Sequence, residues 1–310
     1  MTQQNPTSPA VAAPDMPVFD AHHHFWDTTV NYYPWLCGET IEHFRYGDYR
    51  AICKPYLPAD YRRDTARYRL AGSVYVEAEW DPRDPLGEMR YVETLRRESG
   101  LPVVAVGQAW LDRPEVEATL EGLAGFSFVR GIRHKPRANS APGDAAPGGM
   151  TDSRWQAGYA LLARYGLHFE LQTPWWHLHE AAGLAQRFPD TRIVLNHTGL
   201  PADRSAGGVA AWRRAMAGLA CCPNVAVKIS GLGQRGVRWR ADANREIVLT
   251  TLDLFGIERC MFASNFPVDS LCATFDEIYA GFFEIVAGFG AADQRRLFHD
   301  NACAYYAAQR

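Results

Sequence analysis

Three consecutive histidines, His22, His23 and His24, end a short apolar segment that starts at Val18. On an extended strand successive side chains alternate between the two faces, so we expect His22 and His24 to share one face and His23 to point the opposite way. Two imidazoles on one face can converge on one metal ion or on one substrate carbonyl. A buried, hydrogen-bonded histidine pair without chemistry is the alternative. Ionisable clusters at strand ends favour the functional interpretation.

These histidines belong to the first of several short apolar segments that alternate with helical ones. We expect strands at residues 18–22, 73–78, 103–108, 128–134, 167–171, 192–196, 225–229 and 260–263. Helices are expected at residues 60–69, 85–99, 114–123, 153–165, 179–188, 209–220, 241–255, 275–289 and 293–308. Strands that alternate with helices pair in parallel.

Eight strand–helix units in one chain of this length predict a closed barrel. The predicted fold class is therefore α/β, a single-domain (β/α)8 TIM barrel at residues 17–310, with residues 1–16 as a loose, disordered tail. An open, doubly wound sheet is the alternative. The lack of a glycine-rich phosphate loop after any strand disfavours that alternative.

The composition limits the kinds of partner. A net charge of -3 over 310 residues provides no basic surface for nucleic acid. Seven cysteines, an odd number without repeated spacing, argue against a disulfide framework and favour the cytoplasm. No apolar run approaches the ~18 residues of a membrane span. We expect a cytoplasmic protein with a small-molecule substrate and neither nucleic-acid nor membrane partners, and a homo-oligomer stays open.

Every predicted strand ends in polar or ionisable side chains. In chain order these are His22 and His24, Glu77 and Glu79, Gln108, Arg133 and His134, Gln172, Asn196 and His197, Lys228 and Ser230, and Ser264 and Asn265, with Asp269 shortly afterwards. The active site of such a barrel lies at the C-terminal ends of its strands. The concentration of polar groups at these ends indicates an enzyme or a site for a polar ligand.

Six motifs carry a resemblance to a known family. They are DAHHHFWD (20–27), YPWL (33–36), VRGIRHKP (129–136), NHTGLP (196–201), VKISGL (227–232) and FASNFPVD (262–269). Over residues 18–305 the chain resembles the amidohydrolase superfamily, in particular its branch of TIM-barrel hydrolases with sugar lactonases and 2-pyrone-4,6-dicarboxylate lactonase. The motifs are specific for the superfamily and weak for the substrate.

The resemblance implies a site for a divalent metal ion such as zinc or manganese. The superfamily usually holds metal with an HxH motif on strand one, histidines on strands five and six, and Asp on strand eight. The matching residues here are His22, His24 and His197, and Glu77 is a further ligand candidate. Gln172 stands where a histidine is expected and Asn265 where the Asp is expected. A neutral amide is a poor zinc ligand and cannot deprotonate water, so metal-dependent and metal-free sites remain alternatives.

The activity that the resemblance implies is hydrolysis of a small lactone of a sugar acid or an aromatic-degradation intermediate. This reaction needs a polarised carbonyl, an activated water and a stabilised oxyanion. The residues predicted for catalysis are His22, His24, His197, Lys228 and Asp269. Those predicted to bind substrate are Arg133, His134, Glu77, Gln108, Asn265, Trp35 and Gln172.

The identity of the general base and the partner of Lys228 are not fixed by the sequence. The candidates for the general base are Asp269, Glu77 and His197, and Asp269 can instead cap the helix that follows it. A buried lysine needs a partner, and Glu77 is the candidate for Lys228. Two other functions also remain open, namely a metal-dependent decarboxylase of the aminocarboxymuconate type and a barrel that binds a small acid without catalysis.

Overall fold

The computed structural model describes residues 15–38, 40–144 and 146–307, which include one eight-stranded sheet. Its strands are all parallel and follow one another in chain order. They are β1 (Pro17–His23), β2 (Arg69–Val76), β3 (Val104–Gln108), β4 (Val129–Arg133), β5 (His168–Leu171), β6 (Ile193–Leu195), β7 (Val225–Ile229) and β8 (Cys260–Phe262).

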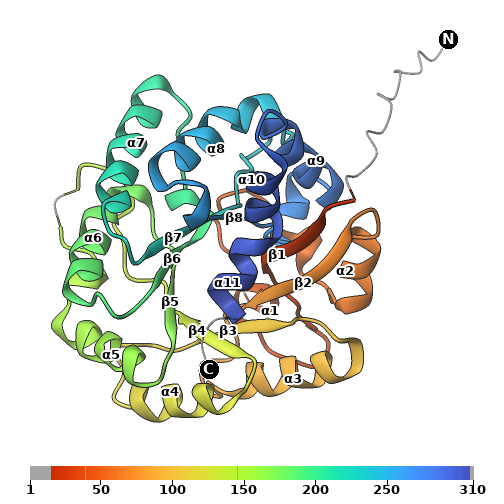
Figure 1. Ribbon diagram of the computed structural model, residues 1–310. Coiled ribbons are helices and arrows are strands. Elements are labelled where there is room, and N and C mark those ends of the chain that lie inside the picture. Colours follow the sequence, from red (N-terminus) through yellow and green to blue (C-terminus); the bar gives the residue numbers. More distant parts are fainter. Residues whose placement is uncertain (1–14, 39, 145, 308–310) are drawn as a thin grey trace.

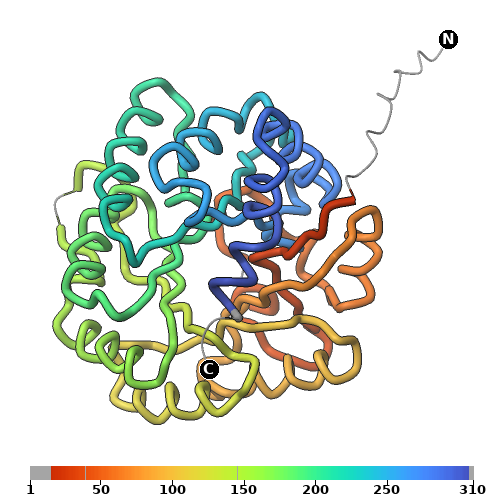
Figure 2. Tube along the Cα trace, viewed as in Figure 1, coloured from red at the N-terminus to blue at the C-terminus, as the bar shows by residue number. Residues whose placement is uncertain are grey.

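The sheet closes between β1 and the segment that follows β8. The backbone amide of Asn265 donates to the carbonyl of His22 at 2.8 Å, and that of His24 donates to the carbonyl of Phe266 at 2.7 Å. Figure 1 shows the ring of strands with helices around it, and in Figure 2 the first strand lies beside the last elements of the chain. The predicted (β/α)8 barrel is confirmed.

The described residues contain eleven α-helices, most of which cover the outside of the ring (Figure 1). They are α1 (Pro34–Cys37), α2 (Pro58–Asp64), α3 (Gly87–Ser99), α4 (Val116–Gly125), α5 (Ser153–Arg164), α6 (Leu178–Arg187), α7 (Ala206–Ala220), α8 (Ala241–Phe255), α9 (Phe275–Ile285), α10 (Ala291–Arg295) and α11 (Asn301–Ala307). Polar side chains set several helix starts. Asp152 accepts the first amides of α5, and Thr274 forms a capping box with Glu277 in α9.

Two apolar layers stabilise the barrel. Inside the ring, buried residues such as Phe19, Val74, Val104 and Met261 pack against one another. Outside it, the strand residues that face the helices form a larger cluster with the inner sides of those helices. Because the strands are buried on both faces, their sequences are apolar runs, and polar residues at their ends stand out.

A bulge in β1 decides which histidines face the interior. Between Asp20 and His23, β1 carries one residue more than its partner β2, so the alternation of side chains shifts by one position. Before the shift, Phe19 and Ala21 belong to the interior cluster, while Asp20 contacts the outer tyrosines Tyr61 and Tyr279. Beyond the bulge, His22 and His24 face the interior together.

The C-terminal segment closes the opposite end of the barrel. The single helix predicted at 293–308 is instead α10, a π-helical turn (Arg296–Asp300) and α11, which bend the chain from the outer layer across the ring (Figure 1). Tyr306 of α11 is buried in the interior cluster. The guanidinium of Arg130, near the start of β4, donates to the Tyr306 carbonyl at 2.9 Å.

Other element boundaries also differ from the prediction. β2 starts at Arg69, where a helix end was predicted, and α2 ends at Asp64. α7 begins earlier than predicted because the Ser205 hydroxyl caps it, and α9 ends earlier, at Ile285. Of the predicted tail, residues 1–14 lie outside the described residues. Within the described residues, no helix has the length and apolar character needed to cross a membrane.

Candidate active site

Strained backbone marks the C-terminal ends of the strands, which we call the mouth. In the described residues, the left-handed conformations outside glycine occur in the segments after β2, β6 and β8, at Glu79, His197, Thr198, Leu200 and Asn265. Each costs on the order of 1–3 kcal/mol and persists only where surrounding structure enforces it. Strain of this kind gathers at functional sites.

His22 and His24 meet inside the mouth. Their Nε2 atoms lie 3.3 Å apart. Nδ1 of His24 lies 2.7 Å from the carbonyl oxygen of Val76, which can only accept, so His24 carries its proton on Nδ1 and presents a lone pair at Nε2. His23 faces away, 2.9 Å from the Ser73 hydroxyl. The predicted orientation of the three histidines is confirmed.

Burial keeps the imidazoles of the mouth uncharged. The exposed fractions of His22, His24 and His197 are 0%, 4% and 2%. Burial lowers the pKa of each well below its usual range, and nearby cations lower it further. These cations are Lys228 for His22, Arg133 for His24 and Arg45 for His197. At neutral pH the site therefore holds neutral imidazoles, each with one nitrogen that can donate and one that can accept.

His197 is held by the strand beside it. Its Nδ1 lies 2.9 Å from the Ser230 hydroxyl at the end of β7. Gly231 follows with φ +61, and a Cβ there would lie 2.7 Å from the His197 ring. Only glycine therefore combines this backbone conformation with this close approach.

Arg133 is held in place through all three of its side-chain nitrogens. Its Nε donates to the Glu77 carboxylate, its second terminal nitrogen to the Glu77 carbonyl at 2.5 Å, and its first to the Gln172 side chain at 3.1 Å. Arg133 and Glu77 are 3% and 1% exposed. Glu77 is therefore not the partner of Lys228, and that prediction was wrong.

Asp269 lies at the end of a buried polar cluster. Its Oδ1 accepts from the Asn265 amide at 2.6 Å and from the Tyr46 hydroxyl at 2.8 Å, and the Arg45 guanidinium lies 3.6 Å away. Burial raises the pKa of Asp269, and these three donors only partly offset the increase. Thr274, rather than Asp269, caps the helix that follows. The carboxylate is therefore available as a base beside Asn265.

Lys228 pairs with a residue that the prediction did not include. Its Nζ lies 2.9 Å from Oε2 of Glu170, and both side chains are fully buried. The two come from β7 and β5 and face the barrel interior. By strand alternation they lie one side-chain layer below Ser230 and Gln172.

Three more side chains were predicted to bind substrate, and only some of them face the mouth. Gln108 faces the interior by alternation with Val104 and Val106 and pairs in register with Arg133. Trp35 is half-buried, and its indole donates to the Ala78 carbonyl at 2.8 Å above β2. His134 points outward instead, because its Nδ1 accepts from the Trp155 indole at 3.0 Å. The structure thus removes His134 from the site.

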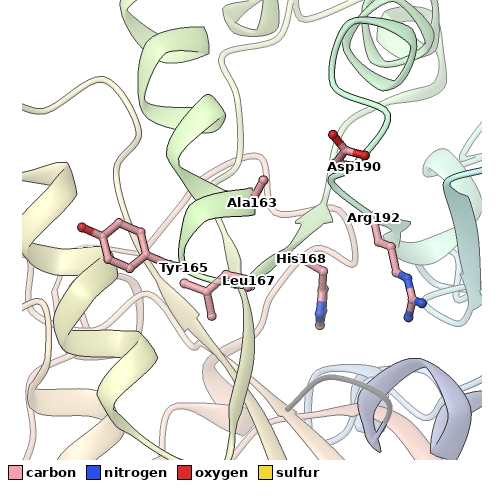
Figure 3. Close-up of a pocket in the computed structure, with 7 residues that line it drawn as sticks. Ala163, Tyr165, Leu167, His168, Asp190 and Arg192 are labelled. Atoms are coloured by element: carbon pink, nitrogen blue, oxygen red, sulfur yellow. The ribbon is translucent and has the colours of Figure 1, made fainter.

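A pocket at the other end of the barrel has a different character. It lies where β5 and β6 begin and is lined by residues that include His168, Asp190 and Arg192 (Figure 3). In the close-up, His168 and Arg192 extend toward the C-terminal segment. None of the residues predicted for catalysis lines this pocket.

Comparison with known proteins assigns the family. A family model described as "Amidohydrolase" matches residues 19–307 of the chain. The chain belongs to this amidohydrolase family. An uncharacterised protein of Sinorhizobium fredii is 38% identical over 298 residues, which cover 94% of this chain and 99% of the relative.

The chain is also similar to a lactonase and to a solved amidohydrolase structure that contains zinc. An L-fucono-1,5-lactonase of Burkholderia multivorans is 27% identical over 270 residues, covering 84% of this chain and 85% of the relative. A crystal structure of a Burkholderia multivorans amidohydrolase with bound zinc has a TM-score of 0.77 and 26% identity, covering 94% of this chain and 99% of that one. The chain is therefore a hydrolase of the amidohydrolase fold.

Amidohydrolases are typically metal-dependent, and the histidine pair at the mouth offers two nitrogen donors for a metal ion. The 3.3 Å between the Nε2 atoms of His22 and His24 suits two nitrogens at about 2.0–2.1 Å from one tetrahedral zinc. A catalytic zinc needs at least a third protein ligand. Among the described residues, no group of three His, Cys, Asp or Glu side chains is arranged to hold an ion. The donors present thus fit only part of such a site.

Sequence reasoning missed three residues of this amidohydrolase. Glu170 alternates with His168 and Gln172 along β5, and this spacing could have identified it as facing the interior. Arg45 and Tyr46 lie in the long irregular segment after β1, which carries no periodic signal. Only the folded chain brings them to Asp269.

Proposed function

We propose that this amidohydrolase opens a small lactone ring by attack of water at the ring carbonyl. The observation that carries the proposal is the contact between two neutral imidazoles, His22 and His24, in a buried mouth that also holds the Asp269 carboxylate. The similarity to L-fucono-1,5-lactonases supports lactones as the substrate class. Such a hydrolysis needs a base, hydrogen-bond donors for the oxyanion and a means to orient the ring.

In this proposal the imidazoles bind the carbonyl oxygen of the lactone. With His24 accepting at Nε2, His22 carries a proton that it can donate. When Nδ1 of His197 accepts from the Ser230 hydroxyl, its proton is on Nε2. In the proposed reaction the carbonyl oxygen replaces Nε2 of His24 as the acceptor of the His22 proton, and His197 donates to the same oxygen. Both bonds strengthen as that oxygen becomes negative.

In this proposal Asp269 is the general base that activates the attacking water. Its raised pKa makes this carboxylate a better base than an exposed one, and Asn265, hydrogen-bonded to it, orients the water. The water oxygen bonds to the carbonyl carbon while its proton passes to Asp269. The tetrahedral intermediate then expels the ring oxygen, which takes that proton back. The product is a hydroxy acid, which ionises and releases one proton.

Substrate orientation is assigned to the surrounding polar and aromatic side chains. Arg133 is fixed by Glu77 and Gln172, so its guanidinium offers a rigid donor surface. Trp35 stacks on Phe44 over the mouth, and Gln108 extends from β3. The proposed partner is a small molecule alone. A cytoplasmic location stays a prediction, and the oligomeric state stays open.

A lactone panel that includes L-fucono-1,5-lactone tests the proposal. Proton release is followed with a pH indicator for the wild type and for Asp269→Asn, with spontaneous hydrolysis subtracted. Turnover of at least one lactone by the wild type and its loss in the variant are expected. If the panel gives no turnover while a small carboxylic acid raises the melting temperature, the barrel is a binding protein. Release of carbon dioxide from an aromatic acid would indicate the decarboxylase alternative.

A further inference from the structure

A buried ion pair lies beneath the mouth, and the reaction proposed above gives no step to either of its residues. Glu170 and Lys228 are both 0% exposed, with 2.9 Å between Oε2 and Nζ. Each precedes by two residues a side chain of the mouth, Gln172 just after β5 and Ser230 just after β7. On a strand this spacing places the pair about 7 Å below the mouth, on the same inner face.

Four neighbours hold the Glu170 carboxylate. The Tyr306 hydroxyl of α11 donates to Oε1, from which Nε2 of His168 lies 3.3 Å, and the Asn196 amide donates to Oε2 beside Lys228. Burial alone would raise the pKa of Glu170, but Lys228 and these donors outweigh it and lower the pKa to about 2. The Glu170 carboxylate is therefore charged at neutral pH.

Lys228 depends on this carboxylate for its charge. Burial lowers the pKa of Lys228 to about 8, and Glu170 provides the largest opposing effect. The Tyr306 ring lies 5.2 Å from the ammonium. The other titratable or charged groups near it are Asp20 and His22 of β1, Arg133 of β4, His168 of β5 and His197 after β6.

The positive charge acts on the mouth. Among the charges around His22, Lys228 has the largest effect. A charge that is fixed in a buried, low-dielectric interior acts over a longer distance than a charge at the surface. It also needs no reorganisation when negative charge develops on a substrate.

We propose that Glu170 is a positioning residue of the candidate site, which holds the Lys228 ammonium charged and in place beneath the imidazoles. This inference rests on the proposed lactone hydrolysis. In that reaction the carbonyl oxygen gains negative charge beside His22, and the ammonium below stabilises it without touching the substrate. No bond to Lys228 or Glu170 forms or breaks, and neither residue takes the proton of the water.

The pH dependence of turnover separates this role from a merely structural one. The kcat and KM of the wild type, Glu170→Gln, Lys228→Met and the control Glu88→Gln are measured from pH 6 to 9 on the best lactone of the panel. Glu88 is an equally buried carboxyl, but it lies on α3 outside the barrel, where the Tyr75 hydroxyl donates to it. Circular dichroism confirms the fold of each variant.

Because a charged Lys228 is needed, wild-type kcat should fall as the pH rises through about 8. Glu170→Gln removes the group that raises the pKa of Lys228, so this decline should move at least one pH unit lower. Lys228→Met should lower kcat at pH 7 at least tenfold, leave KM within threefold and abolish the decline. Glu88→Gln should keep the wild-type profile.

A Glu170→Gln variant with the wild-type decline and kcat would overturn the inference while leaving the lactonase proposal intact. If that variant does not fold, Lys228→Met decides the question in the same way, since wild-type kcat in it removes any role for the charge. A wild type that opens no lactone is a separate failure, that of the proposed function, and it removes the basis of this inference as well.

Discussion

The two ends of the barrel are built from the same eight strands and differ in almost every physical respect. At the mouth the backbone is strained after three strands, and buried polar groups hydrogen-bond in pairs, such as His22 with His24, Arg133 with Glu77 and Asn265 with Asp269. Below the mouth, residues such as Val74 and Val104 pack in regular strands. The far end is closed by Tyr306 of the C-terminal helix.

This contrast indicates a division between stability and chemistry. Apolar packing inside the ring stabilises the fold at low conformational cost. The mouth bears strained residues and buried polar groups, which cost free energy and are retained where their arrangement serves binding or catalysis. Glu170 and Lys228 lie between the two regions and carry charge into the interior. Mutations at the two ends should therefore separate activity from stability.

The largest effect is expected for Asp269→Asn at the mouth. Loss of a general base should lower kcat by about 10²–10⁴-fold with little change in KM. The raised pKa of Asp269 means that the base is lost as the pH falls through that pKa, so wild-type kcat should decrease on the acid side. The residual rate of the variant should lack this acid-side decrease. An unchanged acid profile would remove Asp269 from the reaction.

A similar loss is expected for His24→Ala. Removing one electrostatic group of the mouth should lower kcat/KM by at least ~100-fold while the far-ultraviolet circular dichroism stays native. His23→Gln is the matched control, because this neighbouring imidazole faces the outer layer, where it stacks on Tyr61. The control should lose stability rather than activity. Near wild-type turnover of His24→Ala would refute the assignment of the paired imidazoles.

A smaller effect, on both kcat and stability, is expected for Gly231→Ala. The new Cβ would meet the His197 ring at 2.7 Å on a backbone with φ +61, so the imidazole must move. We expect roughly tenfold lower kcat and a loss of about 1–3 kcal/mol in the free energy of unfolding. Gly256→Ala has a similar φ of +76 with no atom within 4 Å, so it should cost stability without changing kcat. Equal kcat values for the two variants would contradict the packing argument.

Below the mouth, Val74→Ala should change stability alone. This side chain is fully buried in the interior layer, so its truncation leaves a cavity and should cost roughly 1–3 kcal/mol of unfolding free energy in urea. Turnover at 25 °C should stay within twofold of the wild type. Val30, which is 71% exposed, is the control, and its replacement by Ala should stay within about 0.5 kcal/mol. A large loss of turnover in Val74→Ala would break the division between the two regions.

Much of the fold was predictable because it depends on local patterns. Apolar runs on both faces of parallel strands and the amphipathic helices between them identified all eight strand–helix units. The final helix was predicted as one piece, but the chain bends at a π-helical turn to place Tyr306 in the barrel. That bend reflects packing between ends of the chain that are far apart in sequence, which no local pattern reports.

The sequence determined that a parallel barrel forms and that His22, His24, Arg133 and His197 lie at one end of it, because strand order and side-chain alternation are local rules. Only the tertiary structure decided the pairing of charges, in which Glu77 engages Arg133, Glu170 engages Lys228 and His134 turns outward to Trp155. The physical reason is that a buried charge pairs with the group that the closed ring brings within hydrogen-bond distance, and these pairs join positions on or just after strands that are not neighbours in the sheet.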